Sequence, residues 1–286
     1  MKKFILLLLG MTLILSACQD QTSTLTKVDR ISHPHGLAVD IGDPSKLYIA
    51  THEGLLLLKD ETDLYRIGES TDDLMGFTVD KKDPNIFYSS GHPSFGGNIG
   101  FQKTLDGGQT WEKVSDGMNG PVDFHSMTVS PVNSDIIYGF HNGEIQKSSD
   151  GGESWSMLNK QPKGIISLTA DLESEETVYA TTEQGIWVSK NGGGTWEILS
   201  EMLSDATVIV LAQNPDDTNQ MLSFSDTLGL TASNDGGKTW TSIANIPAVF
   251  YFISFSPSVS GLVYAIDSAN QVYKSMDTGI TWQKIY

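Results

Sequence analysis

One eight-residue segment recurs five times along the chain and constrains the fold more than any other feature. Its third residue, Asp or Asn, returns at intervals of 44, 41, 44 and 42 residues. Repeats 40–50 residues apart, with strand-like segments between them, are typical of a β-propeller. The copies are TLDGGQTW (104–111), SSDGGESW (148–155), SKNGGGTW (189–196), SNDGGKTW (233–240) and SMDTGITW (275–282).

The residue types in these octets fit a tight turn between two strands. Asp accepts hydrogen bonds from backbone N–H groups a few residues on, and Gly adopts positive φ without steric cost. The Trp that ends each octet can pack on the neighbouring repeat. Because every repeat needs these residues, we interpret them as structural rather than catalytic. The structural set is Asp106, Trp111, Asp150, Trp155, Asn191, Trp196, Asp235, Trp240, Asp277 and Trp282.

Residues 1–17 have the pattern of a targeting segment. Lys2 and Lys3 precede an apolar run that is too short to span a bilayer comfortably, and the tetrad LSAC ends at Cys18. This tetrad resembles the lipobox of bacterial lipoproteins, so we expect residues 1–17 to be a lipoprotein signal peptide and Cys18 to carry a lipid. Residues 18–26 then form a tether. The expected location is the cell envelope, outside the cytoplasm, with a membrane contact through the lipid.

The charge balance narrows the choice of partners. The chain carries 35 acidic and 18 basic residues, for a net charge of −17, and removal of Lys2 and Lys3 makes it more negative. Such a surface repels phosphate backbones, so we expect no nucleic-acid partner. Cys18 is the only cysteine, which excludes internal disulfides and thiolate metal sites.

Residues 27–286 repeat one unit of four expected strands. Counting the strand pairs gives six units, of which the first has only a degenerate octet at 60–65. We therefore predict an all-β fold in a single domain: a six-bladed β-propeller of four-stranded antiparallel blades, each closed by an octet hairpin. Residues 27–32 either add an outer strand to the last blade or lead into the first.

The octets resemble Asp-box repeats, also called bacterial neuraminidase repeats. The segments HGLAVD (35–40), THEGL (51–55), DLMGF (73–77), SGHP (90–93) and DFHSM (123–127) resemble a group of Asp-box lipoproteins described as glycosylhydrolase-like. This resemblance implies a hydrolase activity. A sialidase needs three arginines, and the chain has only Arg30 and Arg66. Other glycosidases need two carboxylates at a set separation, for which Glu183 and Asp226 are candidates.

The histidines fall at equivalent places in the first three units. Alignment of the units on their second strands puts His or Met at the beginning of the innermost strand, and His at or next to the end of the second strand. Both positions lie at one face of a propeller, and the octets lie at the other. We therefore predict a ligand site at one mouth of the central channel. Its residues are His35, His52, Met75, His92, His125 and His141.

Imidazole and thioether groups together suggest a metal. Imidazole binds copper, zinc, nickel and iron, and a thioether favours Cu(I). The main hypothesis is therefore a lipid-anchored binding protein that holds copper or another transition metal through His35, His52, Met75, His92 and His125. Three alternatives stay open: histidines that line a polar channel and contact an organic ligand, a glycoside hydrolase-type enzyme that acts on a glycan, and a scaffold for another envelope protein.

Overall fold

The computed structural model describes residues 24–246 and 248–286. The expected signal peptide, Cys18 and most of the expected tether lie outside these residues. Within them, no helix is long and apolar enough to cross a membrane.

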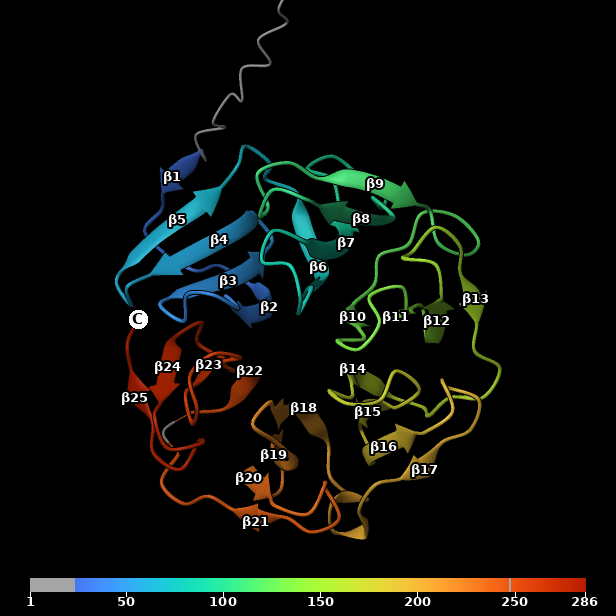
Figure 1. The fold of residues 1–286 in the computed structure, drawn as a ribbon, viewed down its shortest axis with the longest axis vertical. Coiled ribbons are helices and arrows are strands. Elements are labelled where there is room, and N and C mark those ends of the chain that lie inside the picture. The colour runs from blue at the N-terminus through green and yellow to red at the C-terminus, as the bar shows by residue number, and fades with distance from the viewer. Residues whose placement is uncertain (1–23, 247) are drawn as a thin grey trace, which may run out of the picture.

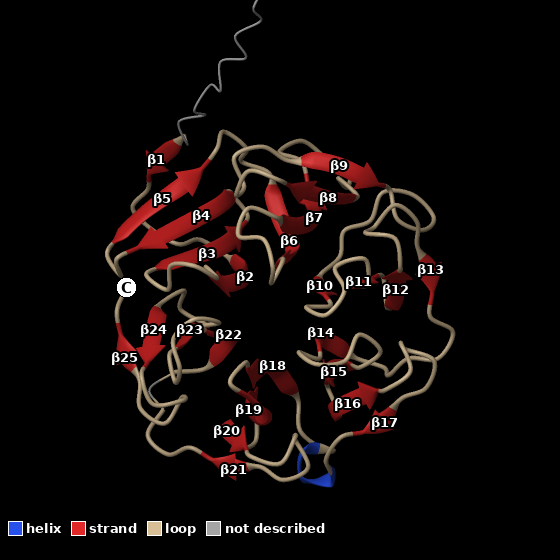
Figure 2. Ribbon diagram, viewed as in Figure 1, coloured by secondary structure: helices blue, strands red, loops and turns tan. Residues whose placement is uncertain are grey.

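Six antiparallel sheets stand in a ring around a central axis (Figure 1). Almost all regular structure in the described residues is strand, and the exception is the 3₁₀ helix η1 (Glu201–Leu203), blue in Figure 2. The prediction of an all-β, six-bladed propeller with four-stranded blades is confirmed. Each blade begins with its innermost strand, and the innermost strands of neighbouring blades touch around the whole ring.

Blades one to three contain the predicted histidines. Blade one comprises β2 (Pro34–Val39), β3 (Lys46–Thr51), β4 (Gly54–Lys59) and β5 (Asp63–Ile67), with β1 (Leu25–Lys27) added outside β5. Blade two comprises β6 (Asp73–Val79), β7 (Phe87–His92), β8 (Phe101–Thr104) and β9 (Glu112–Ser115). Blade three comprises β10 (Ser126–Val129), β11 (Ile137–His141), β12 (Glu144–Ser148) and β13 (Ser156–Met157).

Blades four to six repeat the same up-down order. Blade four comprises β14 (Ile165–Ala170), β15 (Val178–Thr182), β16 (Gly185–Ser189) and β17 (Glu197–Ile198). Blade five comprises β18 (Val208–Asn214), β19 (Asp217–Ser225), β20 (Gly229–Ser233) and β21 (Thr241–Ser242). Blade six comprises β22 (Phe250–Phe255), β23 (Val263–Asp267), β24 (Val272–Ser275) and β25 (Gln283–Lys284).

The core of the propeller is divided into six apolar clusters, one between each pair of neighbouring blades. Side chains alternate along a strand, so each blade contributes to the clusters on both of its faces. In β3, for example, Leu47 and Ile49 pack towards blade six, and Tyr48 packs towards blade two. Burial on both faces explains why these strands read as nearly continuous apolar runs.

The octets close the hairpins between the third and fourth strands. In blade five, Asp235 accepts hydrogen bonds from the N–H and the hydroxyl of Thr239 (2.9 and 2.6 Å), and Ser233 Oγ accepts one from the N–H of Gly237 (2.9 Å). The bonds from Thr239 lower the pKa of Asp235 to about 2. Trp240 packs in the cluster shared with blade four. The octet thus ties its own turn together and joins its blade to the preceding one.

Blade one has no octet Trp, and the N-terminal segment fills its place. Ile31 packs in the cluster between blades one and six, together with Val39 and Tyr264. The Tyr286 hydroxyl donates to the carbonyl of Asp29 (3.2 Å). β1 pairs with β5 of blade one, not with the last blade, so the predicted outer strand belongs to the first blade and begins at Leu25 rather than at residue 27.

Candidate functional site

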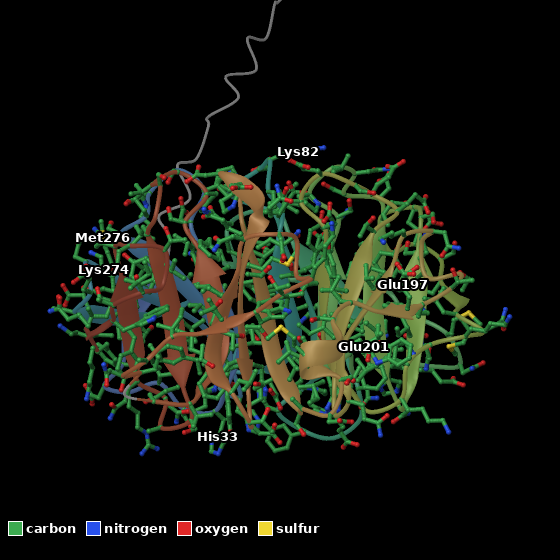
Figure 3. The ribbon with its side chains drawn as sticks, turned by 90° about the horizontal axis from the view of Figure 1, so that it is seen from below. His33, Lys82, Glu197, Glu201, Lys274 and Met276 are labelled. Carbon is green, nitrogen blue, oxygen red and sulfur yellow. The ribbon has the colours of Figure 1, made fainter. Side chains whose placement is uncertain are left out.

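The two faces of the ring carry different side chains. Figure 3 shows His33, which precedes β2, at one face and Lys82, in the turn between β6 and β7, at the other. The up-down order of the strands places the beginning of each innermost strand and the end of each second strand at the face of His33. We call this the histidine face. The octet turns, between third and fourth strands, lie at the opposite side.

A cavity of about 470 Å³ lies in the channel between the innermost strands. The strand register is irregular at the beginning of β2, β14, β18 and β22. In each case one residue is left out of the ladder, and a bulge of this kind re-aims its side chain. His125 lines the cavity, and so do the four residues left out of the ladders: His35, Ile166, Ile209 and Tyr251.

Met75 does not line this cavity, although the alignment put it at the same position as His35. The register of β6 is irregular over Met75 to Thr78, so two residues rather than one leave the ladder. Gly76 and Phe77 line the cavity instead. Gly76 has φ +53°, and a Cβ there would lie 2.4 Å from the carbonyl oxygen of Phe124. Met75, the predicted thioether ligand, is thus not among the residues that line this cavity.

A first cluster of side chains surrounds Asp73, the first residue of β6. His35 Nε2 lies 3.5 Å from Asp73 Oδ1, and His52 Nε2 lies 3.6 Å from Asp73 Oδ2. The ring of His52 is stacked between His35 and His33, with centroid separations of 4.5 and 4.9 Å. Within the described residues, His35 Nε2 and Asp73 Oδ1 are buried and have no hydrogen-bond partner.

Burial sets the protonation of this first cluster. It lowers the pKa of His35 to about 4, so that imidazole is neutral near pH 7. It also raises the pKa of Asp73, despite the opposing charges of His52 and His92. Asp73 is therefore a carboxyl group that keeps its proton to a higher pH than an exposed Asp.

A second cluster surrounds Asp123, which precedes β10. His92 Nε2 and His125 Nε2 each lie 3.0 Å from Asp123 Oδ2. The Asp123 side chain is only 5% exposed, whereas His125 is 63% exposed. Asp123 Oδ1 is buried and makes no hydrogen bond within the described residues. His92 Nδ1 bonds the carbonyl of Gly97 at 3.0 Å, so both ring nitrogens of His92 face acceptors.

Hydrogen bonds, rather than burial, decide the protonation of this second cluster. Burial alone would raise the pKa of Asp123, but the bond from His125 and the charges of His125 and His92 outweigh it, and the pKa is lowered. The bond to Gly97 raises the pKa of His92, and the bond to Asp123 raises that of His125. Asp123 is thus held ionised between two imidazoles that favour the protonated form.

His141 is a structural residue and does not join either cluster through an ion pair. Its Nδ1 lies 2.6 Å from the carbonyl oxygen of Asp123, and its Nε2 lies 2.9 Å from Asn142 Nδ2. Both nitrogens are thereby occupied by neighbouring groups. The ring holds the backbone of Asp123 in place.

The histidines predicted to bind one metal contact two different carboxylates, Asp73 and Asp123. His35, His52 and Asp73 each offer one ligand atom, and these atoms lie within 4.8 Å of one another, so these three residues could hold a metal ion. Nitrogen and oxygen donors of this kind do not select Cu(I). His92 and His125 contact Asp123 instead. The five residues of the predicted set are therefore not gathered around one carboxylate in the described part of the chain.

The sequence alignment missed the two carboxylates that organise the site. Asp73 and Asp123 stand two residues before Met75 and His125, at equivalent positions in blades two and three. The Asp shared by these two positions is therefore the signal in the sequence that could have identified both carboxylates. The proposed pair Glu183 and Asp226 is exposed and lies outside the mouth cavity.

Comparisons with known proteins point towards glycoside hydrolases. No family model matches the chain. A xyloglucanase from Hypocrea jecorina (strain QM6a) is 25% identical over 256 residues, which covers 70% of this chain and 30% of that protein. Among solved structures, the GH74 enzyme of Niastella koreensis has a TM-score of 0.64 at 16% identity, covering 91% of this chain and 46% of that one. YCF48 bound to D1 peptide has a TM-score of 0.57 at 16% identity, covering 92% and 85%.

These similarities contradict the main hypothesis drawn from the sequence. The matched curated proteins are xyloglucanases rather than metal-binding propellers, so the prediction of a copper-type binding protein is wrong, and the glycoside hydrolase alternative fits better. The chain spans 30% and 12% of the lengths of the two curated relatives. The solved structures, all below 25% identity, establish the propeller fold.

Proposed function

We propose that this protein is a glycoside hydrolase-type enzyme that cleaves a neutral β-glucan such as xyloglucan at the histidine face. One observation carries the proposal: two carboxylates at this face have environments that shift their pKa values in opposite directions, Asp73 upwards and Asp123 downwards. Glycosidases of most families need one protonated carboxyl group and one ionised carboxylate on either side of the scissile bond. Such a pair of opposite shifts identifies acid and base.

Asp73 is the proposed general acid. Its burial stabilises the protonated form, which can give a proton to the leaving oxygen of the glycosidic bond. Oδ1 is buried beside His35 Nε2 and has no hydrogen-bond partner within the described residues, so no bond inside the protein competes for the proton. His35, neutral near pH 7, adds no positive charge that would strip the proton from Asp73.

Asp123 is the proposed general base. His92 and His125 bond its Oδ2 and keep it ionised, while its buried Oδ1 bonds no described protein atom. In the proposed reaction the carboxylate of Asp123 takes a proton from the attacking water. The charges of both Asp123 and Asp73 act on His92 and His125, so these imidazoles lie within electrostatic range of both carboxylates. This supports the proposal that the two groups act in one site.

A neutral glucan suits the electrostatics of this chain. The net charge of −17 disfavours anionic polysaccharides, and two arginines cannot build the three-arginine site of a sialidase. The xyloglucanase relatives supply the substrate class in this proposal.

The test is the release of reducing ends from a panel of neutral β-glucans that includes xyloglucan. Asp73→Asn and Asp123→Asn should each lower kcat by about 10²-fold or more, because each removes one proton-transfer group. Glu183→Gln and Asp226→Asn are matched controls on exposed acids and should leave kcat unchanged. Activity that depends on Glu183 and Asp226 instead, or no hydrolysis of any glucan, would refute the assignment.

We further propose, from the sequence, that the octets are Asp-box repeats and that the enzyme is held at the cell envelope by a lipid on Cys18. The LSAC tetrad supports the anchor. Cys18→Ala should move the protein from the detergent phase to the aqueous phase of a Triton X-114 partition. Unchanged partitioning would exclude lipidation at this residue.

A further inference from the structure

Phe95 is 95% exposed, although Phe is a residue that proteins usually bury. It lies in the loop between β7 and β8, on the histidine face and three residues after His92. Full burial of a Phe contributes favourably to folding, and the fold forgoes that contribution here. A single exposed apolar side chain is common on protein surfaces, so the place of Phe95 in the fold decides whether it is informative.

The loop that carries Phe95 is fixed on both sides of the ring. Before it, Asp72 Oδ1 accepts a hydrogen bond from the N–H of Ser94 (3.1 Å). After it, Asn98 Nδ2 donates to the carbonyl of Pro121 (2.9 Å), and the N–H of Ile99 donates to the carbonyl of Gly91 (2.8 Å). The loop is therefore tethered to the rest of the protein on both sides of Phe95, and Phe95 is exposed within this tethered loop.

Two of these contacts join the loop to the proposed catalytic groups. Asp72, which holds Ser94, directly precedes Asp73. Gly97, two residues after Phe95, bonds Nδ1 of His92, whose Nε2 faces Asp123. A second aromatic ring, that of Tyr251, is 46% exposed and lines the mouth cavity from blade six.

We infer that Phe95 is a substrate-binding platform on which a pyranose ring of a neutral glucan stacks, and that this ring guides the chain across the mouth to Asp73 and Asp123. The inference rests on the proposed function and adds its main binding residue. Sugar rings have apolar C–H faces that pack on aromatic rings, and such packing needs no charge. A rigid loop suits this role because little conformational freedom is lost on binding.

Binding and turnover can be measured separately. Xyloglucan oligosaccharide would be titrated by calorimetry into the Asp73→Asn protein with and without Phe95→Ala, and hydrolysis by the Phe95→Ala variant of the active protein would be followed. We expect Kd and KM to rise about tenfold with kcat nearly unchanged, because the packing is present in both ground and transition states. Phe95→Trp should restore binding. Leu105→Ala, at a 59% exposed apolar residue in an octet, is the matched control and should change nothing.

The outcomes separate the two proposals. An unchanged Kd in Phe95→Ala, or a Phe95→Trp variant as weak as Phe95→Ala, would overturn the platform while leaving hydrolysis by Asp73 and Asp123 intact. Binding that depends on Phe95 without any hydrolysis by the unmodified protein would support the platform and refute the enzyme. A protein that binds no oligosaccharide overturns the platform, and aryl glycosides then test the carboxylates alone.

Discussion

The pKa values of two aspartates, Asp73 and Asp123, are shifted in opposite directions by their surroundings. Asp73 lies 3.5–3.6 Å from two imidazoles and forms no close bond with them, so burial dominates and its pKa rises. Asp123 is more deeply buried, yet two imidazoles at 3.0 Å keep it ionised. The distance between an imidazole and a carboxylate therefore matters more than burial in assigning acid and base.

His125→Ala tests whether the hydrogen bond from His125 lowers the pKa of Asp123. Loss of the hydrogen bond should raise the pKa of Asp123, so a smaller fraction is ionised at a given acidic pH. The acid limb of the activity profile should move to higher pH. The alkaline limb should move less, because the charge of His125 is the smallest of the influences on the pKa of Asp73. His33→Ala is the control, because His33 forms no ion pair with either carboxylate in the described residues. An unshifted acid limb would remove His125 from the mechanism.

Chelation distinguishes proton transfer from metal chemistry at Asp73. Hydrolysis should persist after dialysis against EDTA, because both assigned steps are proton transfers by side chains. Activity lost to EDTA and restored by a divalent ion would instead assign His35, His52 and Asp73 to a metal. His52→Ala, which removes one of these ligands, should then lower metal affinity.

At the scale of elements, the sequence predicts regular features well and irregular ones poorly. The octets recur at a nearly constant interval, and the blades follow from that interval. The beginnings of the innermost strands carry bulges, whose length a sequence pattern does not reveal. In β2 one unpaired residue aims His35 at the cavity, whereas in β6 two unpaired residues, Gly76 and Phe77, lie opposite one residue of β7 and line the cavity in place of Met75. The carboxylates were missed because their pKa values depend on partners from other strands.

Ser233→Ala tests the octet as a structural element. The change removes the acceptor for the buried N–H of Gly237, which should lower the free energy of unfolding by about 1–3 kcal/mol. Urea denaturation measures this loss. The exposed Ser242→Ala is the control and should change stability by less than about 0.5 kcal/mol. Hydrolysis should be unaffected, since the octets lie away from the histidine face, and a loss of activity without a loss of stability would show the octet to be functional.

At the scale of the whole molecule, the ring closes by packing rather than by a shared strand. All four strands of blade six come from the C-terminal segment, and β1 extends blade one. The contact between blades one and six is made by Ile31 and its neighbours, together with the Lys274–Glu61 ion pair. Closure keeps the innermost strands, and hence Asp73 and Asp123, at fixed positions around the channel.

Ile31→Ala should therefore destabilise the entire ring. Removing a buried Ile side chain costs about 2–5 kcal/mol, depending on how far the cavity collapses. Leu25→Ala, on the exposed outer strand β1, is the control and should cost less than about 1 kcal/mol. Both values follow from urea denaturation monitored by circular dichroism. Equal effects of the two substitutions would contradict closure through this cluster.

The pH dependence of kcat/KM for xyloglucan hydrolysis tests the central claim most directly, because it reports the acid and the base of the free enzyme. Activity requires Asp123 ionised, above its lowered pKa, and Asp73 protonated, below its raised pKa. We predict an optimum on the acidic side of neutrality, a decline as rising pH deprotonates Asp73, and loss of that decline together with most activity in Asp73→Asn. A rate that stays level through this range, or an alkaline limb that survives in Asp73→Asn, would contradict the assignment.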